Sequence, residues 1–167
     1  MEIMNTDLRI IYLGGGCFWG VEHHLQNLAG VEETQVGYMG GHIDHPDYRL
    51  VCEGGTGHIE VVKVIYNPNE VSDTDILKLF FEIHDPTELN HQGVDIGEQY
   101  ASAVFYTESS QKVACEEVMS ALVNMGYQVV TQLHPAVTFW VGESYHQRYF
   151  DHHPNHPICH TRIKRFN

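Results

Sequence analysis

The chain alternates between short apolar runs and stretches in which apolar residues recur every three or four positions. Short apolar runs bounded by turn residues are typical of strands that a fold buries. The longer runs predict strands at residues 8–13, 31–38, 59–66 and 100–106. Shorter runs at residues 129–131 and 137–141 predict two further, brief strands.

Apolar residues recur at helical spacing in three places. The first predicted helix begins at Cys17, directly after the glycine run at residues 14–16. The second follows Ser72, whose hydroxyl can cap the first turn. The third begins near Glu108 and ends at Gly126, where a glycine cap belongs. These helices and the longer strands alternate along the chain.

The order of these elements predicts the fold class. Strand, helix, strand, strand, helix, strand, then a helix and short strands, indicates an α+β protein. We expect a two-layer ferredoxin-like sandwich with a mixed sheet, helices on one face and an extended coil C-terminus. Polar segments at residues 42–57 and 87–99 predict long loops, which are usually functional. No linker divides the chain, so residues 1–167 predict a single domain with a coil tail at 151–167.

Composition excludes several classes of partner. The 167 residues are 43% hydrophobic and 19% charged, which is ordinary for a globular protein. The formal net charge of −13 would repel nucleic acid. No apolar stretch is long enough to span a membrane. The first ten residues lack the basic start and apolar core of a secretory signal, so we expect a cytoplasmic protein.

Four cysteines are the first candidates for chemistry. Cys17 lies where a glycine-rich turn opens a helix, and helix N-termini stabilise the nucleophilic thiolate; it could instead be a small buried residue at that junction. Cys115 shares a helical face with apolar residues, which favours a core thiol. The polar loop around Cys52 leaves its role open. Cys159, on the tail, can act as a resolving cysteine, form a metal clip with nearby histidines, or have no role.

Five blocks of residues resemble, in chain order, the signature of the A-type peptide methionine sulfoxide reductases. They span roughly residues 10 to 160. Two residues depart from the family pattern: Ile59 stands where the family often has alanine, and Val94 stands where it often has asparagine. The blocks are GCFWG (16–20), GYMGG (37–41) with HPDYR (45–49), VC (51–52) with TGHIE (56–60), HDPT (84–87) with QGVDIGEQY (92–100), and YHQ (145–147) with Tyr149.

The resemblance implies reduction of the S epimer of methionine sulfoxide, protein-bound and free, which repairs oxidised proteins. It implies that Cys17 attacks the sulfoxide sulfur and that Glu60 protonates the oxygen, for which Glu60 must be partly desolvated. Tyr48 and Tyr100 carry hydroxyls that can hold the oxygen. Asp95 resembles the acid that positions water or substrate. Taken alone, these four residues could be an exposed carboxylate, packing tyrosines and a turn aspartate.

Phe18 and Trp19 follow the nucleophile and can enclose the substrate methyl group. After methionine leaves, Cys17 remains as a sulfenic acid, and a second thiol condenses with it to a disulfide. Cys159 is the first candidate for this resolving role, Cys52 the second, and direct reduction by an external thiol the third. The resemblance implies that thioredoxin reduces the disulfide. The chemistry needs no cofactor, whether metal, nucleotide or flavin.

Three other classes of protein remain as alternatives. Cys17 with one of the 13 histidines could form the Cys–His pair of a hydrolase. A peroxide-reducing thiol protein would use Cys17 without a sulfoxide. A metal-binding protein would use the histidines of the tail together with its cysteine. The residues of that cluster are His152, His153, His156, Cys159 and His160.

Overall fold

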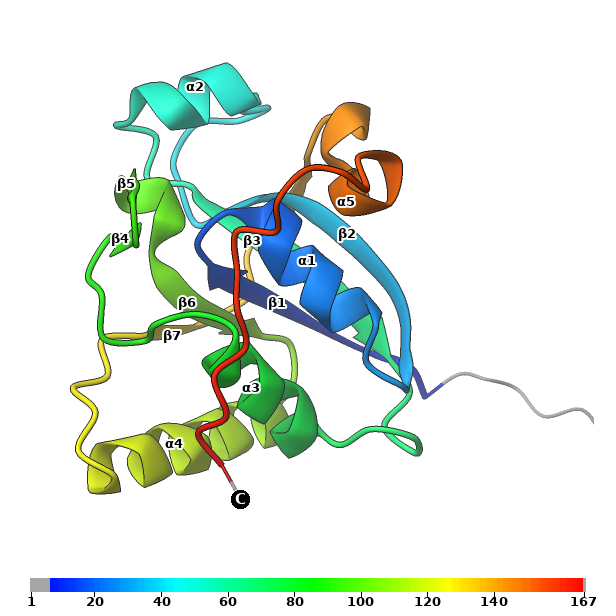
Figure 1. Ribbon diagram of the computed structural model, residues 1–167, viewed down its shortest axis with the longest axis vertical. Helices are drawn as coiled ribbons and strands as arrows, with labels where there is room; N and C mark the ends of the chain where they lie inside the picture. The colour runs from blue at the N-terminus through cyan, green and yellow to red at the C-terminus, as the bar shows by residue number, and fades with distance from the viewer. Residues whose placement is uncertain (1–6, 167) are drawn as a thin grey trace, which may run out of the picture.

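The computed structural model describes residues 7–166. Residues 1–6 and residue 167 lie outside the described residues. The predicted lack of a secretory signal rests partly on residues 1–6. Within residues 7–166, six strands form one mixed sheet in the order β7-β6-β1-β3-β2-β8 (Figure 1). All neighbours pair antiparallel except β6 and β7, which pair parallel. The strands are β1 (Arg9–Gly15), β2 (Val31–Met39), β3 (Ile59–Tyr66), β6 (Ser102–Tyr106), β7 (Gln132–Pro135) and β8 (Trp140–Val141).

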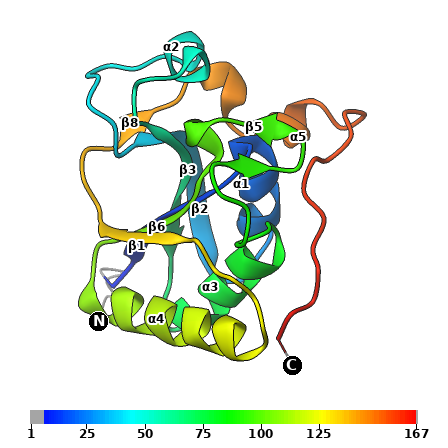
Figure 2. The ribbon, with the colours of Figure 1, turned by 90° about the vertical axis from the view of Figure 1, so that its left-hand side faces the viewer.

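The main hydrophobic core lies between the sheet and three helices, α1 (Phe18–Gln26), α3 (Asp73–Glu82) and α4 (Ser109–Asn124). Figure 2 shows α1 and α3 on the same side of the sheet. Side chains alternate between the two faces of a strand, so Val62 and Val64 of β3 join this core while Val61 joins a smaller cluster on the other face. Segment 136–139 covers that second face. The predicted α+β class with a mixed sheet is confirmed.

Local capping explains where the predicted helices begin and end. The Ser72 hydroxyl accepts a hydrogen bond from the backbone N–H of Asp75 at 3.0 Å, which starts α3. Glu108 and Gln111 form a capping box at the start of α4. Gly126, with φ +102°, follows the end of α4 in a conformation that glycine adopts without strain. These starts and ends agree with the predicted ones.

Several predicted loops and strands need correction. The segment 42–57 contains a helix, α2 (Tyr48–Glu53), which begins because the Asp47 carboxylate accepts from the backbone N–H of Leu50 at 2.8 Å. Residues 129–131 form no strand, and pairing starts only at β7. Short elements occupy other expected loops. These are β4 (His91–Gln92), β5 (Asp95–Ile96), and the 3-10 helix η1 (Glu98–Tyr100). After β8 come the 3-10 helix η2 (Ser144–His146) and α5 (Tyr149–His152).

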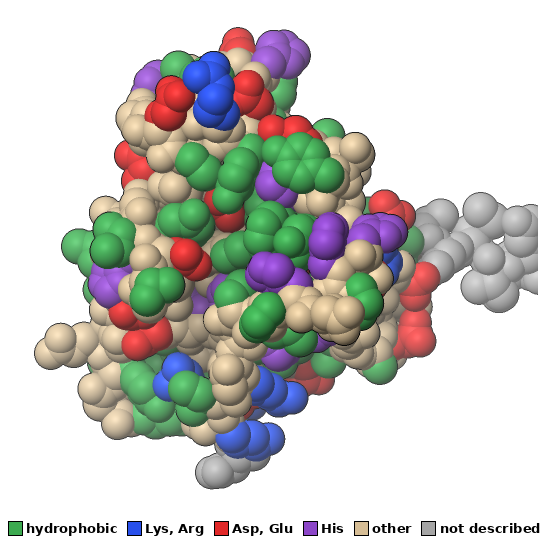
Figure 3. All heavy atoms as spheres, turned by 45° about the horizontal axis from the view of Figure 1, so that its top comes forward, with side chains coloured by type: hydrophobic (Ala, Val, Ile, Leu, Met, Phe, Trp, Pro, Cys, Tyr) green, Lys and Arg blue, Asp and Glu red, His purple; other side chains and the backbone are tan. Residues whose placement is uncertain are grey.

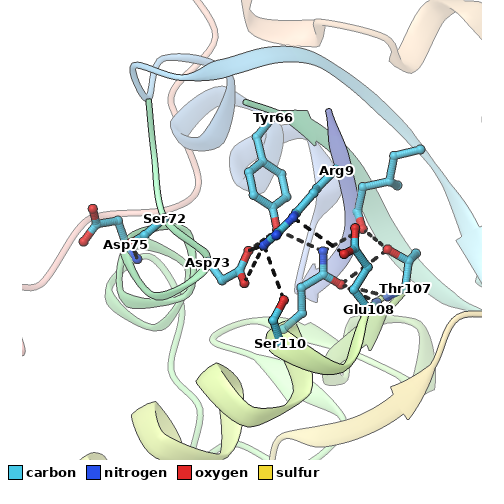
Figure 4. Close-up of polar contacts among 10 residues, drawn as sticks. Arg9, Tyr66, Ser72, Asp73, Asp75, Thr107, Glu108 and Ser110 are labelled. Atoms are coloured by element: carbon cyan, nitrogen blue, oxygen red, sulfur yellow. Dashed lines mark hydrogen bonds and ion pairs between the residues drawn. The ribbon is translucent and has the colours of Figure 1, made fainter. Parts of the chain in front are cut away.

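A polar network ties the ends of β1, β3, α3 and α4 together, on the side of the molecule shown in Figure 4. The Arg9 guanidinium contacts the Asp73 carboxylate at 3.2 Å and the Ser110 hydroxyl at 3.3 Å. The Tyr66 hydroxyl donates to the same carboxylate and accepts from the Gln111 amide at 2.9 Å. Both helices are thereby held against the sheet.

The C-terminal tail is coil, but it is docked against the helices and not free. It passes α1 and then α3 on its way to the C-terminus (Figure 1). The buried Glu82 carboxylate accepts from the Arg162 guanidinium at 2.9 Å and from the backbone N–H groups of Arg165 and Phe166 at 3.0 and 3.2 Å. Among residues 7–166, no helix is long and apolar enough to cross a membrane.

Candidate active site

The turn from β1 into α1 places Cys17 at the N-cap of that helix. Gly16 before it has φ +96°, and a Cβ there would lie 2.8 Å from the Gln92 side chain. Only glycine fits both the backbone conformation and the space at this point. Cys17 is partly exposed.

Glu60 lies next to this turn because β3 pairs with β1. Its Oε1 atom accepts from the backbone N–H of Phe18 at 3.1 Å. Its Oε2 atom is buried and has no hydrogen-bond partner within residues 7–166. The side chain is 1% exposed, and this burial raises the pKa of Glu60 to about 8. At neutral pH the carboxyl therefore keeps its proton and can donate it.

The tail brings Cys159 to Cys17. The two thiols lie within hydrogen-bonding distance, and no disulfide joins cysteines among the residues described. The hydrogen bond to Cys159 and burial raise the pKa of Cys17, and the same hydrogen bond lowers the pKa of Cys159. The backbone N–H of Trp19, in the first turn of α1, acts in the opposite direction and lowers the pKa of Cys17, as expected at a helix N-terminus. His160 contacts the sulfur of Cys159 at 3.2 Å, and this contact also favours the thiolate form of Cys159.

The carboxyl group of Glu60 influences the pKa values of both predicted tyrosines. Burial, and then the proximity of that carboxylate, raise the pKa values of Tyr48 and Tyr100. Both phenols therefore stay protonated and can donate hydrogen bonds. The Tyr48 hydroxyl also hydrogen bonds with the thiol of Cys52. Asp95, on β5, is half-buried, and burial followed by the charge of Cys159 raises its pKa.

Phe18 and Trp19 differ in their surroundings. Phe18 is fully buried and packs against the rings of Tyr38 and His146, at centroid distances of 5.7 and 5.1 Å. Trp19 is only partly buried, and its indole stacks on Tyr149 at 3.7 Å with an interplanar angle of 4°. Trp19 therefore presents a fixed aromatic surface beside the nucleophile, while Phe18 belongs to the core beneath it.

Two residues of the site carried no predicted role. His146 is fully buried, and its Nδ1 atom accepts from the Trp19 indole N–H at 2.9 Å. Glu143 accepts from the Tyr38 hydroxyl and from the backbone N–H of Tyr48, both at 2.8 Å. These contacts fix Trp19 and the start of α2. The YHQ block at 145–147 marked this region, but the partners lie 95 to 127 positions away in sequence.

Two histidines of the tail pack against an aromatic ring. Figure 3 shows histidine side chains gathered beside apolar ones near the middle of one face. His153 stacks on the Tyr149 ring at 4.1 Å, and His156 packs edge-on against the same ring at 5.4 Å. Among residues 7–166, no group of three or more His, Cys, Asp or Glu side chains is arranged to hold a metal ion.

A buried acid, two phenols and two thiols thus meet at the start of α1. Comparison with known protein families identifies the function of this arrangement. The family model described as peptide methionine sulfoxide reductase matches residues 9–167. The chain belongs to the peptide methionine sulfoxide reductase family. It is an oxidoreductase that reduces methionine sulfoxide.

Curated relatives agree with this assignment. The chain is 48% identical over 144 residues to the peptide methionine sulfoxide reductase MsrA of Methanothermobacter thermautotrophicus, covering 84% of this chain and 85% of the relative. It is 46% identical over 148 residues to the MsrA of Deinococcus radiodurans, covering 87% of this chain and 72% of the relative.

Solved structures of this family have the same fold. Reduced Mxr1 from Saccharomyces cerevisiae matches with a TM-score of 0.88 and 31% identity, covering 96% of this chain and 95% of that one. Methionine sulfoxide reductase A of Corynebacterium diphtheriae matches with a TM-score of 0.82 and 32% identity, covering 92% and 79%. The reductase family and its fold therefore rest on independent comparisons.

Proposed function

We propose that this reductase acts on the S epimer of methionine sulfoxide, protein-bound and free, through a sulfenic acid on Cys17. Cys159 resolves that sulfenic acid into a disulfide, which thioredoxin reduces. The observation that carries the proposal is the buried carboxyl of Glu60, whose Oε2 atom has no partner within residues 7–166 and lies beside the nucleophile's turn. A free acid oxygen at this place suits donation to a sulfoxide oxygen.

The first step needs a nucleophile and an acid. The sulfur of Cys17 attacks the sulfoxide sulfur, and Glu60 protonates the oxygen as its bond to sulfur weakens. In net terms the oxygen ends on Cys17 as a sulfenic acid, and methionine leaves as the reduced thioether. A pKa near 8 keeps Glu60 in its acid form at neutral pH, so the proton is available without a prior uptake step.

Neighbouring polar groups stabilise the oxygen and the substrate. Tyr48 and Tyr100 donate hydrogen bonds to the sulfoxide oxygen, because their raised pKa values keep both hydroxyls protonated. Asp95 positions water or the substrate at the edge of the site. Trp19, held by Tyr149, encloses the methyl group together with Phe18, and the exclusion of water there favours methionine sulfoxide over more polar sulfoxides.

The second step uses the tail. Cys159 is already against Cys17 in the described structure, so the two sulfurs need little movement to join. Cys52 is the second candidate, since its thiol lies against the Tyr48 hydroxyl. Yeast Mxr1 has been solved in complex with Trx2, and that chain shares this fold at 21% identity. Cys159 is an exposed residue of the tail, which suits the approach of such a reductant. A thioredoxin-dependent disulfide that is repeatedly reduced also favours a cytoplasmic location.

The proposal extends to the whole chain as one catalytic domain, with the tail at 151–167 as the carrier of the resolving cysteine. The central strand order β6-β1-β3-β2, with α1 and α3 on one face, supports the ferredoxin-like description of the sandwich. The tail's contacts with α1 and α3 support its inclusion in the same unit.

Turnover of racemic methionine sulfoxide tests the proposal. The wild-type protein and Cys17→Ser are incubated with the racemate and dithiothreitol, and the two epimers are then separated by chiral chromatography. We expect the wild type to consume only the S epimer and Cys17→Ser to consume neither. Consumption of the R epimer, or equal activity in the serine variant, would contradict it. Cys115→Ser, a change at a buried thiol in α4, is the matched control.

A further inference from the structure

His160 follows Cys159 in the tail and is held in one orientation by two contacts. The residue is 8% exposed. Its Nε2 atom lies 2.8 Å from the carbonyl oxygen of Gly15, at the end of β1. A carbonyl oxygen can only accept a hydrogen bond, so Nε2 carries a proton. The Nδ1 atom, on the other side of the ring, faces the sulfur of Cys159 at 3.2 Å.

The start of α1 forms a fitted space for this imidazole. A Cβ atom at Gly20 would lie 2.1 Å from Nδ1 of His160, and one at Gly16 would lie 3.2 Å from Nε2. The side chain of His24, on the next turn of α1, contacts the backbone carbonyl of His160 at 2.9 Å. The ring therefore occupies a place that two glycines leave open, with both nitrogens engaged.

We propose that His160 is a catalytic residue of the resolving step, in which its Nδ1 atom accepts the thiol proton of Cys159. This inference rests on the proposed function, in which Cys159 attacks the sulfenic acid. The sulfur of Cys159 loses its proton to Nδ1 and bonds to the sulfur of Cys17, and the bond between Cys17 sulfur and oxygen breaks. The oxygen leaves as water, with the proton it held and the one that Cys159 gave up through His160. The Cys159 thiol is oxidised and the sulfenic acid is reduced, so the step balances.

The charges around His160 support this role. Burial works to lower its pKa, but the hydrogen bond and negative charge of Cys159 outweigh burial, and the net shift is upward. Other titratable groups face the pair from each packed element. They are His24 and Cys17 at α1, Glu60 on β3, His84 after α3, and Asp95 on β5. Burial lowers the pKa values of His24 and His84, so neither opposes protonation of His160 at neutral pH.

The proposal predicts how disulfide formation depends on pH. With His160 as the proton acceptor, a thiolate is available on Cys159 throughout the range from pH 6 to 8. A thiol without such a partner has a pKa of about 8.5, so its thiolate fraction falls roughly 70-fold from pH 8 to pH 6. Replacing His160 should therefore change the slope of the pH profile and not only the rate.

A single-turnover experiment measures that slope. Reduced full-length protein is mixed with one equivalent of methionine sulfoxide at pH 6, 7 and 8 and quenched with acid. Mass spectrometry then counts disulfide and dimedone-trapped sulfenic acid on Cys17. The variant His160→Gln places an amide N–H where Nε2 donates to Gly15 but offers no base to Cys159. His152→Gln, on the exposed part of the same tail, is the matched control.

We expect the wild type and His152→Gln to form disulfide at rates within about threefold across this range. In His160→Gln we expect the rate to fall several tens of fold from pH 8 to pH 6, with sulfenic acid accumulating at pH 6. A flat profile in His160→Gln, even at a lower rate, would mean that His160 only positions the tail and would overturn the proposal. Disulfide formation that persists in Cys159→Ser would show instead that the proposed resolving cysteine is wrong.

Discussion

Glu60 and Glu82 are both buried glutamates, with 1% and 2% of their surface exposed. They lie at the two ends of the path that the tail takes across the helices. Glu60 has one donor, the backbone N–H of Phe18, and one oxygen without a partner among residues 7–166. Glu82 has the Arg162 guanidinium and two backbone N–H groups. Their surroundings differ in hydrogen-bond donors and positive charge, and Glu60 also lies deeper in the protein than Glu82.

This difference determines whether each carboxyl group is protonated at neutral pH. Burial raises the pKa of Glu60 to about 8, since a single donor offsets little of the cost of a buried charge. Burial acts in the same direction on Glu82, but its donors and the charge of Arg162 outweigh it, and the net pKa shift is downward. Burial keeps Glu60 protonated because few hydrogen-bond donors reach its carboxyl group. Donors from the tail reach Glu82, so this glutamate is ionised and holds the tail against α3.

The largest expected effect is on catalysis, from Glu60→Gln. Glutamine has the same shape and can accept from the Phe18 N–H, but it holds no acidic proton. We expect kcat/KM for methionine sulfoxide to fall by about 10² to 10⁴, which is the usual contribution of a positioned general acid. Steady-state assays with dithiothreitol measure this. A loss below tenfold would mean that the proton comes from elsewhere.

The same variant should raise stability, and by more as the pH rises. Because the folded pKa of Glu60 lies above its unfolded value, the folded protein holds a proton that the unfolded chain releases between about pH 4.5 and 8. The wild type therefore loses stability across this window, up to roughly 4 kcal/mol, and the glutamine variant does not. Urea unfolding at pH 5 and pH 8 measures it, with Glu117→Gln on exposed α4 surface as control. A difference that is the same at both pH values would refute the assignment.

A smaller effect of opposite sign is expected for Glu82→Gln. The lowered pKa means that Glu82 stabilises the fold above its unfolded value, near pH 4.3, and that this contribution is lost as the pH falls through the folded value. Hydrogen bonds to a charged group contribute about 1.5 to 3 kcal/mol, so the variant should lose about this much at pH 7 and less at pH 3.5. Urea unfolding at the two pH values measures the loss. An unchanged stability at pH 7 would remove Glu82 as the anchor of the tail.

The sequence predicted those elements whose signals are local. The strand at residues 59–66 has the predicted bounds, and Ser72, Glu108 and Gly126 mark helix ends through contacts within a few residues. The helix α2 was missed because six residues are too few to establish an apolar periodicity, although Asp47 offered a capping signal. The apolar run at residues 129–131 predicts a strand that the structure does not contain, because apolar character does not reveal where pairing with β6 begins.

The site shows the same division. The glycine run and helix start singled out Cys17 from its neighbours alone, and the family resemblance supplied the acid role of Glu60. Nothing local distinguishes Glu60 from Glu82, since each takes its protonation state from groups 42 to 84 positions away. The contact of His160 with Gly15, 145 positions apart, was equally beyond local patterns.

The most direct test of this account is the titration of Glu60 itself. The protein is labelled with carboxyl-¹³C glutamate, and the carboxyl resonances are followed by NMR from pH 4 to pH 10. The Glu60 signal is identified by its loss in Glu60→Gln, and that of Glu82 by its loss in Glu82→Gln. The account predicts a midpoint near pH 8 for Glu60 and one below the ordinary glutamate value for Glu82. A Glu60 midpoint below about pH 5 would contradict its role as the proton donor.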